Sequence, residues 1–271
     1  MKVNLSGVPE TLFITLRIRA IETVKPNGAI KDPYAIDILH RIELASSSKD
    51  KVSERSQAGT IARTLVLDEI ILDFLSKHPK EATVVNLGCG LDARCKRLPL
   101  HNCLWLDIDV EESIGLRKLF FKETDNYKMI ARSMFDDSWM NSVPRGLPLP
   151  IISEGVMMYF KEEDIRELIY RIGQRFHHAE MAFDVINAWT ARNYKWHPDV
   201  KKYNAPFRWG TDNVYEMEDW YPGLHVIKEY LYMDRLKKRW PLFFKVMLPL
   251  FPSLRKSSRI VHMKFQQQSS K

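Results

Sequence analysis

One arginine stands where the sequence pattern predicts an apolar helix face. In AGTIARTLVLDEIILDF, residues 58–74, Leu67, Ile70, Ile71 and Phe74 recur at helical spacing. Arg63 falls on the same stripe. A guanidinium on such a face either extends its charge to water or binds an anionic group through forked, charge-assisted hydrogen bonds. This stretch alone leaves both alternatives open.

A glycine pair and an acidic residue form a second candidate for binding chemistry. The strand-like run ATVVNL leads directly into Gly88 and Gly90, where the missing side chains let a ligand approach the backbone amides. A second strand-like run, LWLDID, ends in Asp107 and Asp109. These acids follow the turn by about 20 residues, the spacing at which a carboxylate accepts hydrogen bonds from a ribose. Together the features favour an adenosine-containing ligand over a purely structural turn.

Two classes of adenosine ligand fit this turn. Read as GxGxxA, it matches a nicotinamide dinucleotide fingerprint, in which the pyrophosphate sits on a helix N-terminus. The other class is S-adenosylmethionine, which has no phosphate but carries an amino-acid carboxylate. Arg63 would neutralise that carboxylate, whereas a dinucleotide leaves Arg63 without a role.

Two further strand ends carry polar groups. In open parallel sheets the ligand lies beyond the carboxyl ends of the strands. The third strand-like run ends near Ser133 and Met134, a polar and an apolar residue suited to the edge and face of an adenine. The fourth ends at Glu154, whose carboxylate would lie near the cofactor's ammonium group or the substrate.

The elements that must position these residues change character along the chain. The first eighty residues read as helices, and shorter apolar runs then alternate with helical ones, which predicts crossover connections and a mostly parallel sheet covered on both faces. We expect one domain, with residues 1–80 as a helical cap, 81–271 as the core, and the aromatic stretch 188–223 as an insertion or lid on the substrate side. The expected helices are 11–24, 32–42, 58–74 and 162–176, and the expected strands are 83–88, 103–109, 127–133, 149–155, 181–187, 225–234 and 259–267.

Composition excludes some classes of protein. With 271 residues, 45% of them hydrophobic, the chain can bury a large core, and no stretch is apolar over the roughly 18–20 residues needed to span a bilayer. The N-terminus lacks a signal-peptide pattern, so we expect a cytoplasmic protein. The three cysteines lack metal-site spacing and are expected to be reduced and structural. The net charge of +7 suits RNA, an acidic protein or an anionic small molecule and selects none of them.

Several motifs in series resemble the leucine carboxyl methyltransferase family, and within it the branch of tetracenomycin-type polyketide O-methyltransferases. The resemblance covers nearly the whole chain. Its motifs are ETLFITLRIRAIET with DPYA after it, ARTLVLD, VVNLGCGLDAR, WLDIDVEESIGLRK, SMFDDSWM, SEGVMMYF, FRWGTDN and WPLFFKVMLPLFPSLRKSSRIV.

The resemblance implies an α/β, Rossmann-like, class I S-adenosylmethionine-dependent methyltransferase fold. This fold has a seven-stranded, mostly parallel sheet, an N-terminal helical cap and an insertion before the last two strands. The implied activity is O-methylation of a hydroxyl or carboxylate of a small molecule, such as an aromatic polyketide or related secondary metabolite. The alternatives are a protein C-terminal carboxyl methyltransferase, an NAD-dependent oxidoreductase, an RNA methyltransferase and a binding-only protein. The chain lacks an RNA-binding signature and the (N/D)PPY-type motif of amino methyltransferases, so no nucleic-acid partner is expected.

The family also implies roles for particular residues. By resemblance, Arg63 matches the arginine that holds the methionine carboxylate, and Glu154 matches the glutamate near the methionine end. Gly88 and Gly90 match the cofactor loop, and Asp109 matches the acid that follows the second strand, with Asp107 as a less suitable substitute. Ser133 and Met134 match an Asp-Leu pair near the adenine. The chain departs from the family pattern at Ser133, which replaces Asp, and at Val110, which replaces proline.

The residues that would meet the methyl acceptor are less defined. Candidates for a general base are His197, Tyr215, Glu216 and His225, each of which can equally be a packing residue. A group of aromatic residues either forms a flat acceptor slot or the core of the lid: Trp189, Trp196, Phe207, Trp209 and Trp220. The segment RLKKRWPLFFKVMLPLFPSLRKSSR mixes basic and apolar residues. It fits a solvated face over a core helix, a dock for an acidic acyl carrier protein, or an anionic lipid surface.

Overall fold

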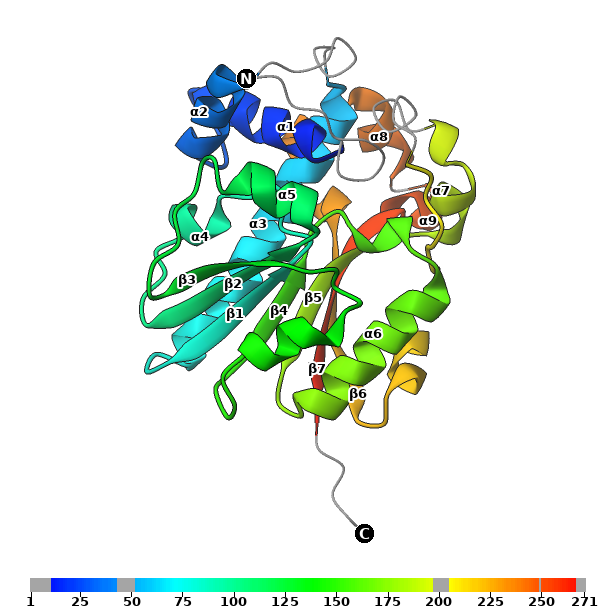
Figure 1. The fold of residues 1–271 in the computed structure, drawn as a ribbon. Helices are drawn as coiled ribbons and strands as arrows, with labels where there is room; N and C mark the ends of the chain where they lie inside the picture. The colour runs from blue at the N-terminus through cyan, green and yellow to red at the C-terminus, as the bar shows by residue number, and fades with distance from the viewer. Residues whose placement is uncertain (1–10, 43–51, 197–204, 249, 267–271) are drawn as a thin grey trace.

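A single seven-stranded sheet forms the centre of the computed structural model, which describes residues 11–42, 52–196, 205–248 and 250–266. The strand order is β3-β2-β1-β4-β5-β7-β6, with helices on both faces (Figure 1). All seven predicted strands are present: β1 (Ala82–Leu87), β2 (Cys103–Asp109), β3 (Tyr127–Ala131), β4 (Pro150–Ser153), β5 (Glu180–Ile186), β6 (Leu224–Leu231) and β7 (Ser258–Phe265).

Five neighbouring strands, β3, β2, β1, β4 and β5, run parallel to one another, as the alternation of strands and helices predicts. β7 is antiparallel to both of its neighbours, β5 and β6. This seven-stranded, mostly parallel topology is the one that the resemblance implies. The carboxyl ends of the parallel strands lie at the same edge of the sheet, where the predicted site residues follow them.

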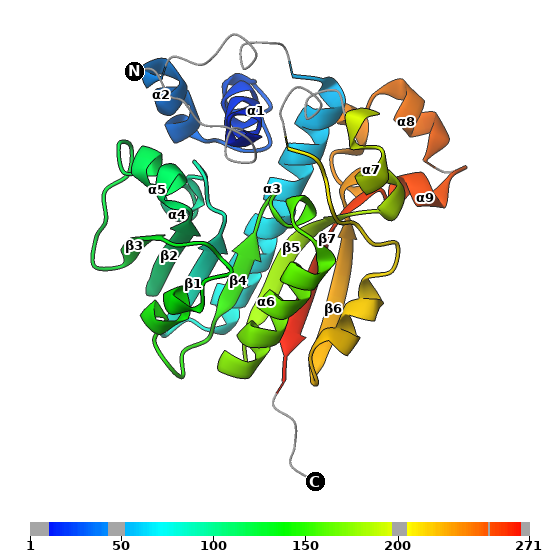
Figure 2. The ribbon, with the colours of Figure 1, turned by 45° about the vertical axis from the view of Figure 1, so that its right-hand side comes forward.

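Two long helices cover the opposite faces of the sheet (Figure 2). α6 (Glu162–Arg175) buries Ile165, Leu168, Ile169 and Ile172, which confirms the predicted helical period. The side chains of successive strand residues point to opposite faces of the sheet. Val85 belongs to the core under α6, and its neighbour Val84 packs on the side of α3. Two apolar layers, one on each face, therefore hold the sheet.

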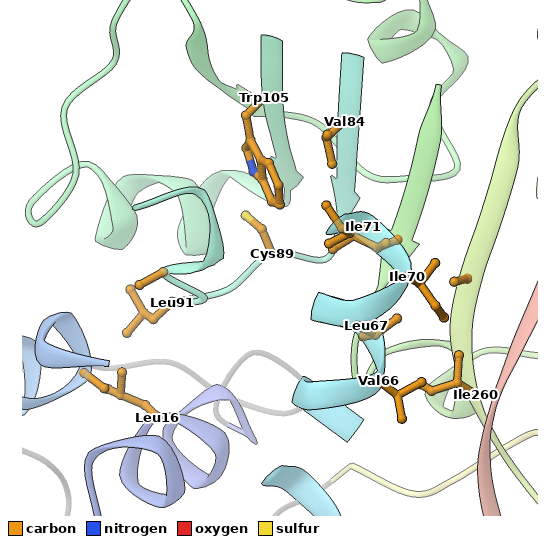
Figure 3. Close-up of a cluster of buried hydrophobic side chains, with 14 of the residues drawn as sticks. Leu16, Val66, Leu67, Ile70, Ile71, Val84, Cys89, Leu91, Trp105 and Ile260 are labelled. Atoms are coloured by element: carbon orange, nitrogen blue, oxygen red, sulfur yellow. The ribbon is translucent and has the colours of Figure 1, made fainter. Parts of the chain in front are cut away.

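α3 (Glu54–Lys77) starts four residues before its predicted beginning because the Ser53 side chain accepts a hydrogen bond from the backbone N–H of Ser56. Its C-terminal part packs on the sheet, where Val66, Ile70 and Ile71 lie in the same apolar cluster as Val84 and Ile260 (Figure 3). Its N-terminal part extends past the carboxyl edge of the sheet and carries Arg63 there.

A helical cap lies over this edge (Figure 1). It consists of α1 (Leu12–Val24) and α2 (Pro33–Arg41). Asp32 caps α2 by accepting from the Ala35 N–H at 3.0 Å, and it pairs with the Nε of Arg19 at 3.0 Å. Arg19 also donates to the carbonyl of Leu91 at 3.0 Å, which ties α1 to the glycine turn.

Two long connecting segments, which we call excursions, precede and follow β6 in the sequence. The first excursion connects β5 to β6 and lies where the lid is predicted. The second excursion connects β6 to β7 and was not expected as a separate structural unit. None of the helices in the described residues combines the length and apolar character needed to cross a bilayer. The shorter helices are α4 (Arg94–Arg97), α5 (Glu111–Arg117), α7 (Ala188–Arg192), α8 (Leu242–Met247), α9 (Pro252–Arg255), and the 3-10 turns Asp137–Ser142, Met157–Tyr159, Tyr194–Trp196, Val214–Trp220, Tyr232–Asp234 and Lys237–Arg239.

A fully buried ion pair stabilises the first half of the sheet. The Asp107 carboxylate accepts from the Nη2 of Arg117, from the Trp105 indole at 2.8 Å and from the Asn86 amide at 3.1 Å. Arg117 also donates to the carbonyl of Gly90 at 3.0 Å. Breaking a buried pair leaves an uncompensated charge in a low dielectric, which is strongly destabilising.

We expect Arg117→Leu to lower the free energy of unfolding by about 3–5 kcal/mol, because Asp107 would keep its charge without its cation. Urea denaturation followed by circular dichroism measures this change. Lys77→Ala is the control, since Lys77 forms an exposed pair with Asp73 at 2.6 Å and its loss should have little effect. Equal effects of the two substitutions would contradict the structural role of Arg117.

Candidate functional site

A cavity of about 280 Å³ opens at the carboxyl edge of the sheet, between the glycine turn and the cap. It is the place where the ends of four neighbouring strands converge. All the predicted binding residues except Arg63 line it: Gly88, Gly90, Asp109, Ser133, Met134 and Glu154, joined by Leu12, Thr15, Arg19 and Asp92 among others. We refer to this space as the cofactor cavity.

The glycine turn requires its glycines. Gly88 and Gly90 have φ angles of +69° and +46°, a region that residues with a Cβ rarely adopt. A Cβ on Gly88 would lie 2.6 Å from Cγ2 of Val156. Because the positions are bare, backbone of the turn lines the cavity directly, as a nucleoside ligand requires.

Asp109 occupies the end of β2 and faces the cofactor cavity. Its carboxylate accepts hydrogen bonds from the backbone N–H groups of Gly90 and Val110, both at 2.8 Å. Burial raises the pKa of Asp109, although these two hydrogen bonds and Ser113 counteract it. Asp107, two residues earlier, has its side chain in the buried pair with Arg117 and does not line the cavity. Of the two acids at the end of β2, Asp109 is therefore the one available to a ligand.

Ser133 and Met134 follow β3 and line the cofactor cavity. Ser133 is exposed and its hydroxyl accepts from the Phe135 N–H at 3.3 Å, while Met134 is buried against the core under α6. One wall thus offers a polar edge beside an apolar face.

Glu154, directly after β4, is held by two arginines. Its Oε2 accepts from the Nη2 of Arg94 at 2.5 Å, and its Oε1 lies 3.2 Å from the Nε of Arg63. Burial would raise the pKa of Glu154, but the cations of Arg63, Arg94 and Arg19 outweigh burial and hold this pKa at about 2. Glu154 is consequently ionised at neutral pH, and it lines the cavity.

Arg63 is 9% exposed, so the alternative in which it extends its charge to water is wrong. Its Nη1 donates to Asp184 at 3.0 Å, and its guanidinium lies against Gly155, whose Cβ would approach it to 3.0 Å. Asp184 accepts a further hydrogen bond from the Gly155 N–H at 2.6 Å. Burial lowers the pKa of Arg63, but Asp184 and Glu154 outweigh it and raise that pKa. Arg63 is thus a buried cation that forms ion pairs with two carboxylates, those of Asp184 and Glu154.

Arg63 and Asp184 line a second cavity, of about 130 Å³, next to the first. The two cavities share Thr11, Thr15 and Gly155 on their walls. Apolar and aromatic side chains make up much of the second wall: Ile14, Met158, Tyr159, Ile186, Phe207, Tyr232, Met233 and Trp240. We refer to it as the acceptor cavity.

Three important residues of the site escaped the sequence analysis. Asp184 is the carboxylate that holds Arg63, and an acid inside the apolar run MAFDVIN was a usable signal that a buried partner exists. Arg94 is fully buried and joins Asp92, Glu154 and, at 2.6 Å, Asp68. Arg19 had no such signal, since its charge follows an ordinary helical pattern.

Three of the four candidates for a general base lie away from the site. Tyr215, Glu216 and His225 are exposed and line neither cavity, and His197 lies outside the described residues. Tyr215 and Glu216 belong to the 3-10 turn Val214–Trp220, which packs on β6 and α6 away from the carboxyl edge. Their placement there is a correction to the predicted roles.

The aromatic residues of the predicted lid have different positions, and only some of them lie near the site. Phe207 lines the acceptor cavity, whereas Trp189 is exposed and does not. Trp209 and Trp220 are buried under the sheet with ring centroids 5.9 Å apart. The packing interpretation is therefore right for these two residues, and neither lines the acceptor cavity.

A dinucleotide fits this turn poorly. A pyrophosphate needs the free N-terminus of a helix, but α4 has only four residues and its first N–H donates to Asp92 at 3.0 Å. Asp92 adds a negative charge where a phosphate would lie. A ligand without phosphate, with an adenosine for Asp109 and the glycine turn, fits the same cavity.

Residues 13–173 match the profile of the Leucine carboxyl methyltransferase family. The chain belongs to this family. Tetracenomycin polyketide synthesis O-methyltransferase TcmP of Streptomyces glaucescens is 32% identical over 233 residues, which cover 86% of each chain. The S-adenosyl-L-methionine-dependent methyltransferase dpfgK of Gibberella zeae is 29% identical over 243 residues, covering 82% of each.

Solved structures agree with the family at the level of the fold. Magnesium protoporphyrin IX methyltransferase from Synechocystis PCC 6803, solved with bound S-adenosylmethionine, has a TM-score of 0.51 at 10% identity and covers 97% of this chain and all of its own. A DUF574 family protein from Streptomyces avermitilis has a TM-score of 0.56, also at 10% identity, over 93% and 97% of the two chains. The protein is an S-adenosylmethionine-dependent O-methyltransferase.

For this methyltransferase we expect Asp109→Asn to weaken the binding of S-adenosylhomocysteine about tenfold or more. Hydrogen bonds to an ionised acceptor contribute about 1.5–3 kcal/mol, and the amide keeps the shape but not the charge. Isothermal titration calorimetry measures the dissociation constant. Glu111→Gln is a matched control, because Glu111 is exposed two residues further on and also loses one charge. Similar losses in both variants would mean that net charge, and not the Asp109 contact, explains the effect.

Proposed function

We propose that the enzyme methylates an oxygen atom, hydroxyl or carboxylate, of a small aromatic molecule such as a polyketide bound in the acceptor cavity. The observation that carries this proposal is the pair of adjoining cavities. One has the glycine turn and Asp109, the other has an apolar wall, and they meet at Thr11, Thr15 and Gly155. Two ligands held in these cavities would be neighbours, as direct transfer between them requires.

In this proposal Gly88, Gly90, Asp109, Ser133 and Met134 hold the adenosine part of the cofactor. Arg63 binds its carboxylate, and Glu154 its ammonium group. The clamp on Arg63 is compatible with this role because a guanidinium has five N–H donors and Asp184 takes one of them. The negative charge of Glu154 at neutral pH suits an ammonium partner.

When bound, S-adenosylmethionine supplies a methyl group already activated on a positively charged sulfur. The protein's own task is then to orient the acceptor oxygen and exclude water. Met158, Tyr159, Phe207 and Trp240 form the apolar wall that excludes it. Asp184 is the one carboxylate on this wall among the described residues, so it is our candidate to take the proton of a hydroxyl acceptor. A carboxylate acceptor would need no base.

Arg55 defines the chemistry of the acceptor further. It lines the acceptor cavity and lies over the Phe244 ring, 5.1 Å from its centroid. In the part of the chain that the structure describes it has no ion pair, and burial lowers its pKa. An unpaired, half-buried cation on an apolar wall fits an acceptor with an acidic group. A protein C-terminal carboxylate is the second candidate acceptor that this cation would suit.

We expect Arg63→Ala to weaken S-adenosylhomocysteine binding roughly tenfold to a hundredfold, the contribution of charge-assisted hydrogen bonds to a carboxylate. The same variant should bind 5′-methylthioadenosine like the wild type, since this ligand lacks the amino-acid group. Calorimetry with both ligands, on protein verified as folded by circular dichroism, makes the comparison. Arg63→Lys, which keeps the charge, should fall between. Equal losses of affinity for the two ligands would mean that Arg63 stabilises the site but does not bind the carboxylate of the cofactor.

We expect Arg55→Gln to raise the KM for 6-hydroxy-2-naphthoate about tenfold or more while changing that for 2-naphthol little, because only the first carries a carboxylate. Methyl transfer from radiolabelled S-adenosylmethionine to each compound measures this. Unchanged S-adenosylhomocysteine affinity is the control for an intact cofactor cavity. A wild-type enzyme that methylates neither aromatic compound would count against the aromatic acceptor, and equal KM changes would count against Arg55 as its anchor.

A further inference from the structure

An exposed apolar ridge stands on the second excursion, beside the acceptor cavity. It consists of Leu242, Phe243 and Val246 on α8, together with Leu250 and Phe251. Each of these side chains is between 48% and 74% exposed. Soluble surfaces rarely gather large apolar side chains in this way unless they contact a partner. Figure 2 shows α8 and α9 at the side of the molecule, next to α7.

The ridge is firmly seated on the protein. On the inner side of α8, Phe244 is buried and packs on Trp240, with ring centroids 6.1 Å apart. Trp240 in turn lines the acceptor cavity, and its indole donates to the carbonyl of Arg235 at 2.9 Å. Leu242, Phe243 and Val246 are therefore presented by an anchored helix.

The surroundings of the ridge are positive. Between Asp234 and Ser257 the sequence has seven basic residues and no acidic one. A hollow of about 490 Å³ next to the ridge is lined by Lys237, Lys245 and Arg255 among others. Arg255 pairs with Asp234, whereas Lys237 and Lys245 are exposed and have no ion pair among the described residues. A hollow with unpaired ammonium groups suits a phosphate-bearing group.

We propose that the ridge and its basic hollow bind the surface of an anionic phospholipid membrane. The apolar side chains would enter the boundary between headgroups and acyl chains, and the lysines would bind lipid phosphates. Large apolar residues beside a basic fringe are the composition of segments that lie in this interface.

Two other partners fit less well. A second copy of the chain, docked through a symmetric interface, would bring the same basic residues face to face. An acidic acyl carrier protein, the other predicted partner, would satisfy the lysines but leaves the exposure of five apolar side chains without explanation. A lipid surface accounts for both the charge and the apolar ridge.

The location of the ridge adds a consequence that rests on the proposed function. Trp240 and Phe244 separate the ridge from the acceptor cavity, and Phe244 also contacts Arg55. The acceptor cavity would thus lie just beneath the docked face, close to an apolar, acidic acceptor dissolved in the membrane. Membrane binding itself does not depend on this acceptor.

Sedimentation with sucrose-loaded vesicles tests the proposal. We expect the full chain to sediment with vesicles of equal parts phosphatidylcholine and phosphatidylglycerol, and much less with phosphatidylcholine alone. The triple variant Leu242→Ser, Phe243→Ser, Val246→Ser should lower the partition coefficient roughly tenfold or more. Lys237→Gln with Lys245→Gln should lower it for the anionic vesicles only. Leu119→Ser with Tyr215→Ser and Ile227→Ser is the matched control, because these apolar residues are exposed elsewhere.

The proposal is overturned if the wild type ignores anionic vesicles, or if the control variant loses as much binding as the ridge variant. It is also overturned if the ridge variant only changes the oligomeric state in size-exclusion chromatography, or if the lysines bind an acidic acyl carrier protein and no vesicle.

Methylation of 6-hydroxy-2-naphthoate without vesicles separates the membrane-binding hypothesis from the hypothesis of an aromatic acceptor. Loss of that activity in a protein that still binds vesicles would reject the acceptor and leave the membrane surface standing.

Discussion

The buried ion network around Glu154 is the constraint on which the rest of the site depends. Arg63 from α3, Arg94 from the end of the glycine turn and Glu154 from the end of β4 have almost no contact with water, so their charges must be matched within the protein. Asp184 at β5 and Asp68 on α3 complete the match. Because these groups come from separate elements, the network fixes how α3, the turn and two strand ends lie relative to one another.

This network also explains why two cavities stand side by side. Gly155 lines both cavities and leaves room for the Arg63 guanidinium, which lines the acceptor cavity. The cap closes the first cavity through Arg19, and the excursion after β6 closes the second through Tyr232 and Trp240. Methyl transfer depends mainly on the alignment of two ligands, and in the proposed function the adjoining cavities would supply this alignment.

The second excursion has two faces with different tasks. Its inner face completes the acceptor cavity with Trp240, while its outer face carries the apolar ridge and the unpaired lysines. The same helix, α8, contributes Phe244 inward and Phe243 outward. A partner bound to the outer face would therefore be separated from the acceptor cavity by Trp240 and Phe244. The surface that the protein binds would then lie close to the cavity that takes the substrate.

The sequence by itself determined the seven strands, the periodicity of α6 and the glycine turn, because each depends on local pattern and spacing. Spacing also placed Asp107 and Asp109 at the end of the second strand, and the resemblance to the family favoured Asp109. It also flagged Arg63 as a cation in need of a partner. Only the tertiary structure decided that this partner is Asp184, 121 residues away, that Asp107 belongs to Arg117, and that Tyr215, Glu216 and His225 lie away from the site. The acceptor wall likewise joins Ile14, Phe207 and Trp240 from distant parts of the chain. Such contacts arise where separate elements pack together, and no local pattern records which distant side chain will fill the space or balance the charge.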